Sequence, residues 1–321
     1  MSDAAQSERI RARRPQKPPV DPWRPLGSQV EEERGADGRM RDSLTVFLAG
    51  SECPFTCVFC DLWQYTLDQP TPPGAIPKQL EIVFESLGPD IVPDSIKLYN
   101  ASNFFDRNAV PPQDLGEITD QLAGFRRVTV ECHPRLVGES CFSFAENLEG
   151  ELEVAMGLET IHPEASSRLN KQMTLSDFAQ ATRLLRVHGI GIRAFVLLSP
   201  PFVTQRESVE WTVRTVEFAL EHDVGVVSVI PMRGGNGEME RLGELGLFEP
   251  PTLEMLEESM IRALGLSGGV VLADLWDVEA LAACPICRDE RLSHLREMNR
   301  MGTVGAAVDC PSCRVGERGD A

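Results

Sequence analysis

The sequence predicts an α/β fold in which a partial (β/α)6-type barrel is followed by a small C-terminal four-cysteine metal knuckle. Three observations support this prediction. Short apolar runs alternate with amphipathic helical patterns over residues 43–275, which is the pattern of a parallel sheet covered by helices. Three closely spaced cysteines follow the first apolar run. Two Cys-x-x-Cys pairs lie near the C-terminus, with the spacing of a metal site.

The elements follow one another in regular alternation. The apolar runs predict strands at 44–50, 95–99, 128–132, 152–157, 192–198 and 224–230, with a last apolar run at 270–272. Helical patterns lie between them, at 77–87, 112–123, 138–147, 174–189, 209–220 and 252–265. Functional groups in such folds lie on loops at the carboxyl ends of the strands, and this is where the three cysteines are expected.

The length and composition are those of a globular protein. The chain has 321 residues, 42% of them hydrophobic and 25% charged, which suits one large domain with a small appendage. No apolar run is long enough to span a membrane, and the N-terminus is charged. We therefore expect a cytoplasmic protein with no membrane partner. In a reducing compartment, nine cysteines indicate metal sites before disulfides.

The charge is unevenly distributed. The net charge is −18, yet residues 1–42 hold nine Lys/Arg and eight Asp/Glu, so the acidic excess lies in the remainder. Such a surface disfavours a polyanionic partner. Residues 1–42 have almost no apolar periodicity and are predicted to be a disordered N-terminal tail, in which Trp23 either docks on the body or is exposed.

The first cysteine cluster is Cys53-Pro-Phe-Thr-Cys57-Val-Phe-Cys60. Three thiolates do not complete a tetrahedral zinc site, but they can hold three irons of a 4Fe-4S cluster and leave one iron open. The alternatives are structural thiols, or a zinc site completed from elsewhere in the chain. The pattern Cys-x-x-x-Cys-x-aromatic-Cys after a first strand resembles the radical S-adenosylmethionine (SAM) superfamily.

This resemblance implies a radical SAM core barrel over residues 43–275 and a definite chemistry. The open iron would chelate the amino and carboxylate groups of SAM. One electron, delivered by a donor such as flavodoxin or ferredoxin, would cleave SAM to methionine and a 5′-deoxyadenosyl radical. That radical would abstract a hydrogen atom from a substrate that the sequence does not name. The class would be oxidoreductase, lyase or transferase, and no catalytic side chain is assigned.

Several residues are candidates for binding SAM. The resemblance places Phe59 beside the adenine, although this ring could instead shield the cluster from water. Where the superfamily has a Gly-Gly-Glu motif for the SAM ammonium, this chain has Asn100, Ser102 and Asn103; these residues either offer polar atoms to SAM or form a turn before a helix.

Three charged residues complete the candidate SAM site. Glu131 and Glu159 end two successive strands, where a carboxylate can accept from ribose hydroxyls or from the ammonium. The Gly-x-Glu159 sequence resembles the Elongator and coproporphyrinogen-oxidase branches of the superfamily. Arg193 lies within an apolar strand and needs an anionic partner, either the SAM carboxylate or a structural carboxylate such as Glu159. His133, after Glu131, is a ligand or a hydrogen-bonded structural residue.

The C-terminal segment, residues 276–321, contains the second metal motif. Its four cysteines are Cys284, Cys287, Cys310 and Cys313. The Cys-Pro-x-Cys pairs favour a structural Zn2+, while an auxiliary iron–sulfur cluster would accept the same four thiolates. The remaining Cys132 and Cys141 are expected to be buried structural thiols. The loop 233–237 is glycine-rich and is expected to be flexible and to face the substrate.

Longer matches indicate a branch of the superfamily. The segments 95–106, 130–137, 153–160 and 193–202 resemble the radical SAM subunit of archaeosine synthase, a group related to the Elongator catalytic subunit. This resemblance implies C–N bond cleavage in a lysine adduct of a tRNA base. The chain has Asn-Ala-Ser-Asn where that family has Thr-Ser-Gly-Ser, and it is acidic, so a tRNA-modifying enzyme is the alternative to an enzyme with another substrate. A non-catalytic metal-binding protein is the third hypothesis.

Overall fold

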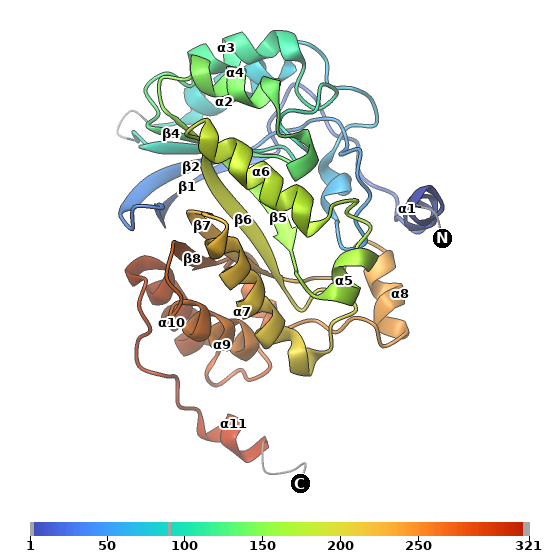
Figure 1. Cartoon of the computed structure of the whole chain (residues 1–321), viewed down its shortest axis with the longest axis vertical. Helices are drawn as coiled ribbons and strands as arrows, with labels where there is room; N and C mark the ends of the chain where they lie inside the picture. Colours follow the sequence, from blue (N-terminus) through green and yellow to red (C-terminus); the bar gives the residue numbers. More distant parts are fainter. Residues whose placement is uncertain (1–2, 89–90, 317–321) are drawn as a thin grey trace.

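Eight strands form one sheet that curls into a half-barrel in this computed structural model (Figure 1). The structure describes residues 3–88 and 91–316. The strands lie across the sheet in chain order, and all neighbours are parallel except the antiparallel β1–β2 pair. Within the described residues they are β1 (Gly27–Arg34), β2 (Met40–Phe47), β3 (Ser95–Tyr99), β4 (Arg127–Glu131), β5 (Glu151–Glu159), β6 (Gly191–Leu198), β7 (Val226–Pro231) and β8 (Val270–Ala273).

Helices connect the parallel strands. The crossovers from β2 to β8 contain, in order, α2 (Ala75–Ser86), α3 (Leu115–Gln121), α4 (Glu139–Asn147), α6 (Leu175–Val187), α7 (Gln205–Glu221) and α9 (Leu253–Ala263). Further described helices are α1 (Asp3–Arg11), α5 (Pro163–Arg168), α8 (Glu238–Glu244), α10 (Arg288–Met301) and α11 (Pro311–Gly316), with short 3-10 helices η1 (Leu62–Tyr65), η2 (Pro112–Asp114), η3 (Pro134–Leu136) and η4 (Val278–Leu281). The predicted alternation of strands and helices is confirmed.

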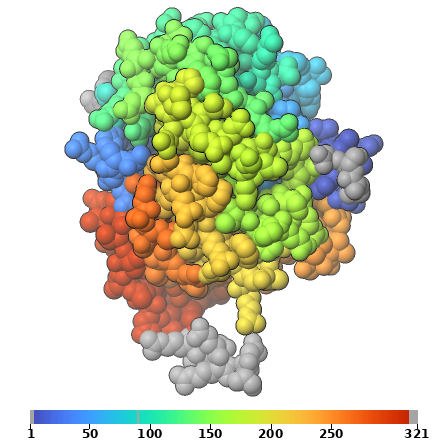
Figure 2. Space-filling view, in the orientation of Figure 1, coloured from blue at the N-terminus to red at the C-terminus, as the bar shows by residue number. Residues whose placement is uncertain are grey.

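The apolar core lies between the sheet and the helices that cover it. Side chains alternate between the two faces of each strand. One set, which includes Leu44 and Val46 of β2 and Ile96 and Leu98 of β3, is fully buried against the helices. Figure 2 shows α6 (yellow-green) and α7 (golden yellow) packed side by side over this outer face. Helix α6 begins with a capping box between Thr174 and Asp177.

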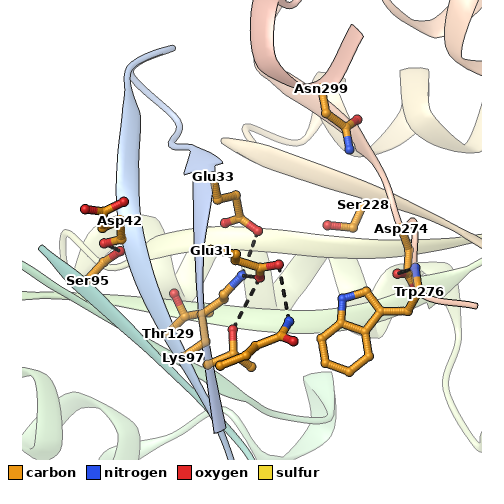
Figure 3. A network of polar contacts seen from close by, with 12 residues as sticks. Glu31, Glu33, Asp42, Ser95, Lys97, Thr129, Ser228, Asp274, Trp276 and Asn299 are labelled. Carbon is orange, nitrogen blue, oxygen red and sulfur yellow. Dashed lines mark hydrogen bonds and ion pairs between the residues drawn. The ribbon is translucent and has the colours of Figure 1, made fainter. Parts of the chain in front are cut away.

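The concave face of the sheet is polar. Residues on alternate positions of the strands form an ion-pair network there (Figure 3). Lys97 of β3 contacts Glu31 and Glu33 of β1, each at 2.8 Å. Arg193 of β6 contacts Glu33 at 2.6 Å and Glu153 of β5 at 2.9 Å. The interior of the half-barrel is therefore a place for charged groups rather than a second apolar core.

The structure differs from the sequence analysis at the N-terminus. Residues 1–42 were expected to form a disordered tail, whereas the described part contains α1 and β1 and the start of β2. The strand β1 lacks the apolar alternation that predicts a strand, because Glu31 and Glu33 point inward to cations instead of to an apolar core. Its stabilisation comes from Lys97 and Arg193, which are far away in the sequence.

The C-terminal segment packs onto the barrel. Helix α10 contacts β8, α9 and β1, and the Asn299 side chain exchanges two hydrogen bonds of 2.8 Å with the backbone of Ala273 in β8. Residues 317–321 lie outside the described part. The predicted boundary between the core, residues 43–275, and the C-terminal segment, residues 276–321, stays a prediction. Among the described helices, none has the length and apolar character needed to cross a bilayer.

Candidate SAM and metal sites

The cysteine loop, residues 53–60, follows β2 at the carboxyl end of the parallel strands. Cys53, Cys57 and Cys60 are free thiols, and each is partly buried. Burial raises the pKa of the Cys57 thiol, and the neighbouring Cys60 and Cys53 add to the rise while Lys171 opposes it.

Side chains from two distant loops hold the backbone of the cysteine loop. Asn170 Nδ2 donates to the carbonyl of Thr56 at 2.6 Å. Asn236 Nδ2 donates to the carbonyls of Val58 at 2.8 Å and Cys60 at 3.2 Å. Because these amides replace the regular hydrogen bonds that a loop lacks, they fix the loop in one shape.

An apolar cluster lies beneath the same loop. Val58 is buried together with residues from α1, β6, the end of β7 and α8: Ile10, Leu197, Met232, Met239, Leu242 and Phe248. Phe59 packs against this cluster and is only partly buried. Phe59 thus lies where its ring can shield the cysteines from water, and its predicted contact with adenine stays a prediction.

The loop after β3 carries polar atoms without partners. Asn100 is fully buried, and neither its Oδ1 nor its Nδ2 has a hydrogen-bond partner among the described residues. Ser102 Oγ is likewise buried and without a partner in that part of the chain. Leaving buried polar atoms unpaired costs free energy. A ligand with hydrogen-bonding groups, such as the methionyl part of SAM, would satisfy them.

Asn103 connects this loop to the cysteines. Its Nδ2 donates to Cys53 Sγ at 3.1 Å, and its Oδ1 accepts from the backbone N–H of His133 at 2.6 Å. The Asn103 side chain therefore contacts Cys53, and its predicted contact with SAM stays a prediction. Hydrogen bonds to cysteine sulfurs tune the potential of an iron–sulfur cluster.

Glu131 shapes the loop after β3 from the end of β4. Its Oε2 accepts from the backbone N–H of Asn100 at 3.1 Å. Burial raises the pKa of Glu131 to about 7, although the backbone N–H groups of Asn100 and Ala101 oppose the rise. Ala101 has a positive φ of 53°. The carboxyl group thus holds a strained turn at the predicted site.

His133 has a structural environment. Its ring stacks on Phe55 of the cysteine loop at 3.7 Å between ring centres. Its Nδ1 accepts from the Arg135 N–H at 3.2 Å, so its Nε2 carries the proton and donates to the Lys171 carbonyl at 3.0 Å. Burial lowers the pKa of His133 to about 3, so the ring is neutral. Both nitrogens are occupied by the backbone.

Glu159 forms a buried ion pair beside the cysteine loop. Its Oε1 accepts from Lys171 Nζ at 2.6 Å. Burial alone would lower the pKa of Lys171, but the adjacent Glu159 carboxylate outweighs this effect and raises the pKa. A Cβ at Gly157 would lie 2.0 Å from Glu159 Oε1 and 2.5 Å from Lys171 Nζ. The pair therefore needs glycine at this position.

Backbone strain surrounds this ion pair. Glu159 has a φ of 66°, and Asn170 and Gln172, which flank Lys171, have φ of 54° and 56°. The register between β5 and β6 shifts between Gly157 and Glu159. Non-glycine residues adopt this conformation at a cost and often do so where a side chain must be aimed at a ligand. Here the strain turns both charges toward the cysteines.

Arg193 has structural partners. Its guanidinium is buried and contacts the carboxylates of Glu33 and Glu153, and its pKa is raised well above the usual value because these carboxylates outweigh the effect of burial. A structural carboxylate was one of the two partners expected for Arg193. The observed carboxylates are those of Glu33 and Glu153, and not that of Glu159. Binding of SAM by Arg193 stays a prediction.

The four C-terminal cysteines converge. Their sulfurs all lie within 4.8 Å of one another, with Cys284–Cys310 at 3.9 Å and Cys287–Cys313 at 3.7 Å. A tetrahedral ion with Zn–S bonds of about 2.3 Å has sulfur–sulfur edges of about 3.8 Å. Among residues 3–88 and 91–316 this is the one such compact group of three or more potential ligands. The spacing fits one tetrahedral ion, whereas the thiols of a four-iron cluster sit on separate irons.

A buried charged network supports this group from α9 and α10. Arg291 Nε donates to Cys287 Sγ at 3.3 Å, and its guanidinium also pairs with Glu257. Glu257 Oε1 contacts His294 Nδ1 at 2.6 Å. Such a network orients a metal ligand and offsets the charge of thiolates. The helices α9 and α10 thereby couple the metal group to the barrel.

Three residues of the candidate site were not predicted from the sequence. Lys171 and Asn170 lie in a loop with no recognisable motif. Asn236 lies in the loop 233–237, which was expected to be flexible and to face the substrate. It is instead buried and holds the cysteine loop.

Comparisons with known proteins bear on the predicted resemblance. No protein-family model matches the chain. An uncharacterised protein of Methanocaldococcus jannaschii is 23% identical over 255 residues, which are 74% of this chain and 70% of the relative. Archaeosine synthase subunit beta of Methanosarcina acetivorans is 28% identical over 177 residues, 52% of this chain and 50% of the relative. The chain thus spans about half the length of the archaeosine synthase subunit that it matches.

The fold has a solved counterpart. The archaeal Elp3 of Methanocaldococcus infernus, with an N-terminal deletion, superposes with a TM-score of 0.50 at 14% identity, over 70% of this chain and 58% of that one. At this identity the match shows the fold. With the cysteine loop, these findings agree with the predicted resemblance to the radical SAM superfamily. The sequence is similar to archaeosine synthase subunit beta.

Proposed function

We propose that Cys53, Cys57 and Cys60 bind a 4Fe-4S cluster and that the enzyme uses it to cleave SAM reductively and abstract a hydrogen atom from a substrate. The observation that carries this proposal is the arrangement of the cysteine loop. Three partly buried thiols lie at the carboxyl end of a parallel half-barrel, next to the unpartnered polar atoms of Asn100 and Ser102. When bound, the cluster supplies the electron for SAM cleavage.

The side chains around the loop have complementary roles. The amide and backbone of Asn100 and the hydroxyl of Ser102 hydrogen-bond the amino and carboxylate groups of SAM. Glu159 accepts from the ribose hydroxyls or the ammonium, and Lys171 attracts the SAM carboxylate while it neutralises Glu159. Glu131 and Asn103 position this machinery through the backbone and Cys53.

Water is kept from the site by packing. The apolar cluster around Val58 closes one side of the cysteine loop, and the N-terminal segment lies over another. A reactive radical has to be protected from solvent. An electron donor such as flavodoxin or ferredoxin would reach the cluster from the surface.

SAM binding provides the test. The anaerobically reconstituted protein should bind SAM in equilibrium dialysis and form 5′-deoxyadenosine when reduced with dithionite. Cys57→Ala should lose both properties, whereas Cys141→Ala, which alters a buried thiol on α4, should keep them. Equal SAM binding by the Cys57→Ala protein would contradict the proposal.

The C-terminal group is proposed to hold one structural Zn2+. The sulfur–sulfur distances of 3.7 and 3.9 Å support a single tetrahedral ion. Arg291 favours the charged thiolate of Cys287. Removal of the metal by a chelator should lower the melting temperature, because the four thiols join segments that are otherwise far apart in the chain.

A second candidate is modification of a tRNA base, as in archaeosine synthase. The similarity to archaeosine synthase subunit beta favours it, and the net charge of −18 disfavours a large tRNA interface. This candidate predicts salt-dependent tRNA binding that is lost in Cys284→Ala and kept in Cys141→Ala. If the protein does not bind tRNA even at low salt, this candidate function is excluded.

A further inference from the structure

Arg233 has buried donors that nothing in the described structure satisfies. It follows β7 by two residues, on the rim that carries the cysteine loop. Its Nε and Nη2 are buried and have no hydrogen-bond partner among the described residues. Nη1 lies 3.6 Å from the Asp277 carboxylate, whose side chain is 91% exposed. An ion pair of this length with an exposed partner contributes little, so the guanidinium lacks a strong partner.

Arg233 lies between the cysteine loop and the segment that follows β8. Asn236, three residues further along the chain, donates to the Cys60 carbonyl at 3.2 Å, and Arg233 Nη1 faces Asp277. Among the described ion pairs, Asp277 is the one carboxylate within 4 Å of the Arg233 guanidinium. The unpaired donors of Arg233 are therefore placed beside the cysteine loop.

An aromatic side chain lies in the same segment after β8, next to Asp277. The backbone N–H of Trp276 donates to Asp274 Oδ1 at 3.0 Å, and its indole packs edge-on against Phe47 at 5.1 Å between ring centres. Figure 3 shows Asp274 and Trp276 together at the end of β8. Trp276 is 42% exposed, so part of its indole ring is open to a ligand or to solvent.

We propose that Arg233 binds an oxyanion, a carboxylate or phosphate group, of a ligand that lies between the cysteine loop and Trp276. Two parallel N–H groups of a guanidinium match the two oxygens of such a group. In the context of the proposed function, on which this assignment of the ligand rests, the oxyanion belongs either to SAM or to the substrate.

Chemical footprinting tests the proposal directly. Phenylglyoxal modifies accessible arginines, and the Arg233 side chain is 37% exposed. The anaerobically prepared full-length protein is treated alone and with SAM, acetate or inorganic phosphate, and mass spectrometry follows the rate at each arginine. Arg214, exposed on α7 and paired with Glu210, is the internal control. We expect one of the ligands to slow modification of Arg233 about tenfold and to leave Arg214 unchanged.

The pattern of protection distinguishes the sources. Protection by SAM assigns the oxyanion to the SAM carboxylate. Protection by acetate or phosphate but not by SAM assigns it to the substrate. An Arg233 that reacts at the same rate in all four conditions overturns the proposal. Acetate and phosphate need no cluster, so failure of the SAM chemistry would leave this result interpretable.

A variant supplies an independent measurement. Arg233→Gln should weaken the binding of the protecting ligand about ten- to a hundredfold, the effect of losing a charge-assisted hydrogen bond. Arg233→Lys should retain part of the affinity, and Arg214→Gln should bind as the unmodified protein does. The iron content of each variant is measured to verify that the cysteine loop is intact. Undiminished affinity in Arg233→Gln, with full iron content, would also refute the role.

Discussion

Gly157 occupies a point in the barrel where a methyl group would collide with the Glu159–Lys171 ion pair. The distances from its ideal Cβ, 2.0 Å and 2.5 Å, are far below van der Waals contact. Glycine in a strand interior is otherwise unfavourable. Its presence here indicates that the position of the ion pair matters more than the stability of the strand.

Gly157→Ala should therefore displace the ion pair. We expect a loss of about 1–3 kcal/mol in the free energy of unfolding, which is typical of overpacking, and at least a tenfold loss in SAM affinity. Gly191→Ala, where a Cβ would meet its nearest atom at 3.4 Å, is the matched control. Urea denaturation and equilibrium dialysis measure the two effects. If the Gly157→Ala protein bound SAM as tightly as the wild type does, the ion pair would not be part of the SAM site.

Glu131 gives the protein a specific pH dependence. Its pKa is raised from 4.5 to about 7 in the folded protein. The stability contributed by the neutral carboxyl group is fully present below pH 4.5 and is lost as the pH rises through about 7. The total is at most about 3 kcal/mol, because one pKa unit corresponds to about 1.4 kcal/mol.

Glu131→Gln should remove this pH dependence and keep the hydrogen bond from Asn100, since a glutamine oxygen accepts equally well. The stability of the variant relative to the wild type should increase from about pH 5 and level off above about pH 8. Urea titrations across this range provide the measurement. A difference between the two proteins that does not change with pH would show that Glu131 does not titrate there.

At the scale of elements, the N-terminal segment, residues 7–14, packs over one side of the cysteine loop. Ile10 of α1 is 2% exposed and packs in the cluster around Val58. Arg14 pairs with Glu52 at 2.9 Å and lies over the Trp63 ring. Asn170, which holds the loop, also donates to Ser7 Oγ at 3.0 Å. In Figure 1 this segment lies beside α8, on the rim of the barrel.

Ile10→Asp should loosen this packing, because a carboxylate does not remain in an apolar cluster without a partner. We expect the iron–sulfur absorbance of the reconstituted variant to decay several-fold faster in air. Val187→Asp, at a position on α6 that is 82% exposed, should decay like the wild type. Equal decay of all three proteins would mean that the segment does not protect the cluster.

The β1 strand depends on charges rather than on apolar packing. Arg193→Met would leave Glu33 and Glu153 without their shared guanidinium. Removing one partner from a buried ion pair costs about 3–5 kcal/mol. The free energy of unfolding should fall by about this amount, whereas Arg183→Met, on the exposed face of α6, should have little effect. A small loss in Arg193→Met would indicate that water replaces the guanidinium.

For the molecule as a whole, local patterns in the sequence predicted what local physics determines. The strand at 95–99 and the helix predicted from residue 174 depend on neighbours a few residues away. The cysteine loop was recognised because its three thiols are closely spaced in the chain. The four-cysteine group was recognised for the same reason, since each pair is local.

Features that depend on distant partners were not predictable. β1 is held by Lys97 and Arg193, which are 64 and 160 positions from Glu33. No periodic pattern in the sequence predicts contacts between residues that are so far apart. Lys171 reaches Glu159 only through a backbone turn with positive φ on both sides. The unpartnered donors of Arg233 are visible only once the rim of the barrel is assembled.

The metal content of the whole protein tests the central claim most directly. Protein purified without oxygen is analysed for iron, sulfide and zinc, together with the Cys53/Cys57/Cys60→Ala triple variant. We predict about four irons and one zinc per chain, with the iron lost and the zinc kept in the variant. An iron content that the triple substitution does not change would show that the cysteine loop is not the cluster site, and it would contradict the account.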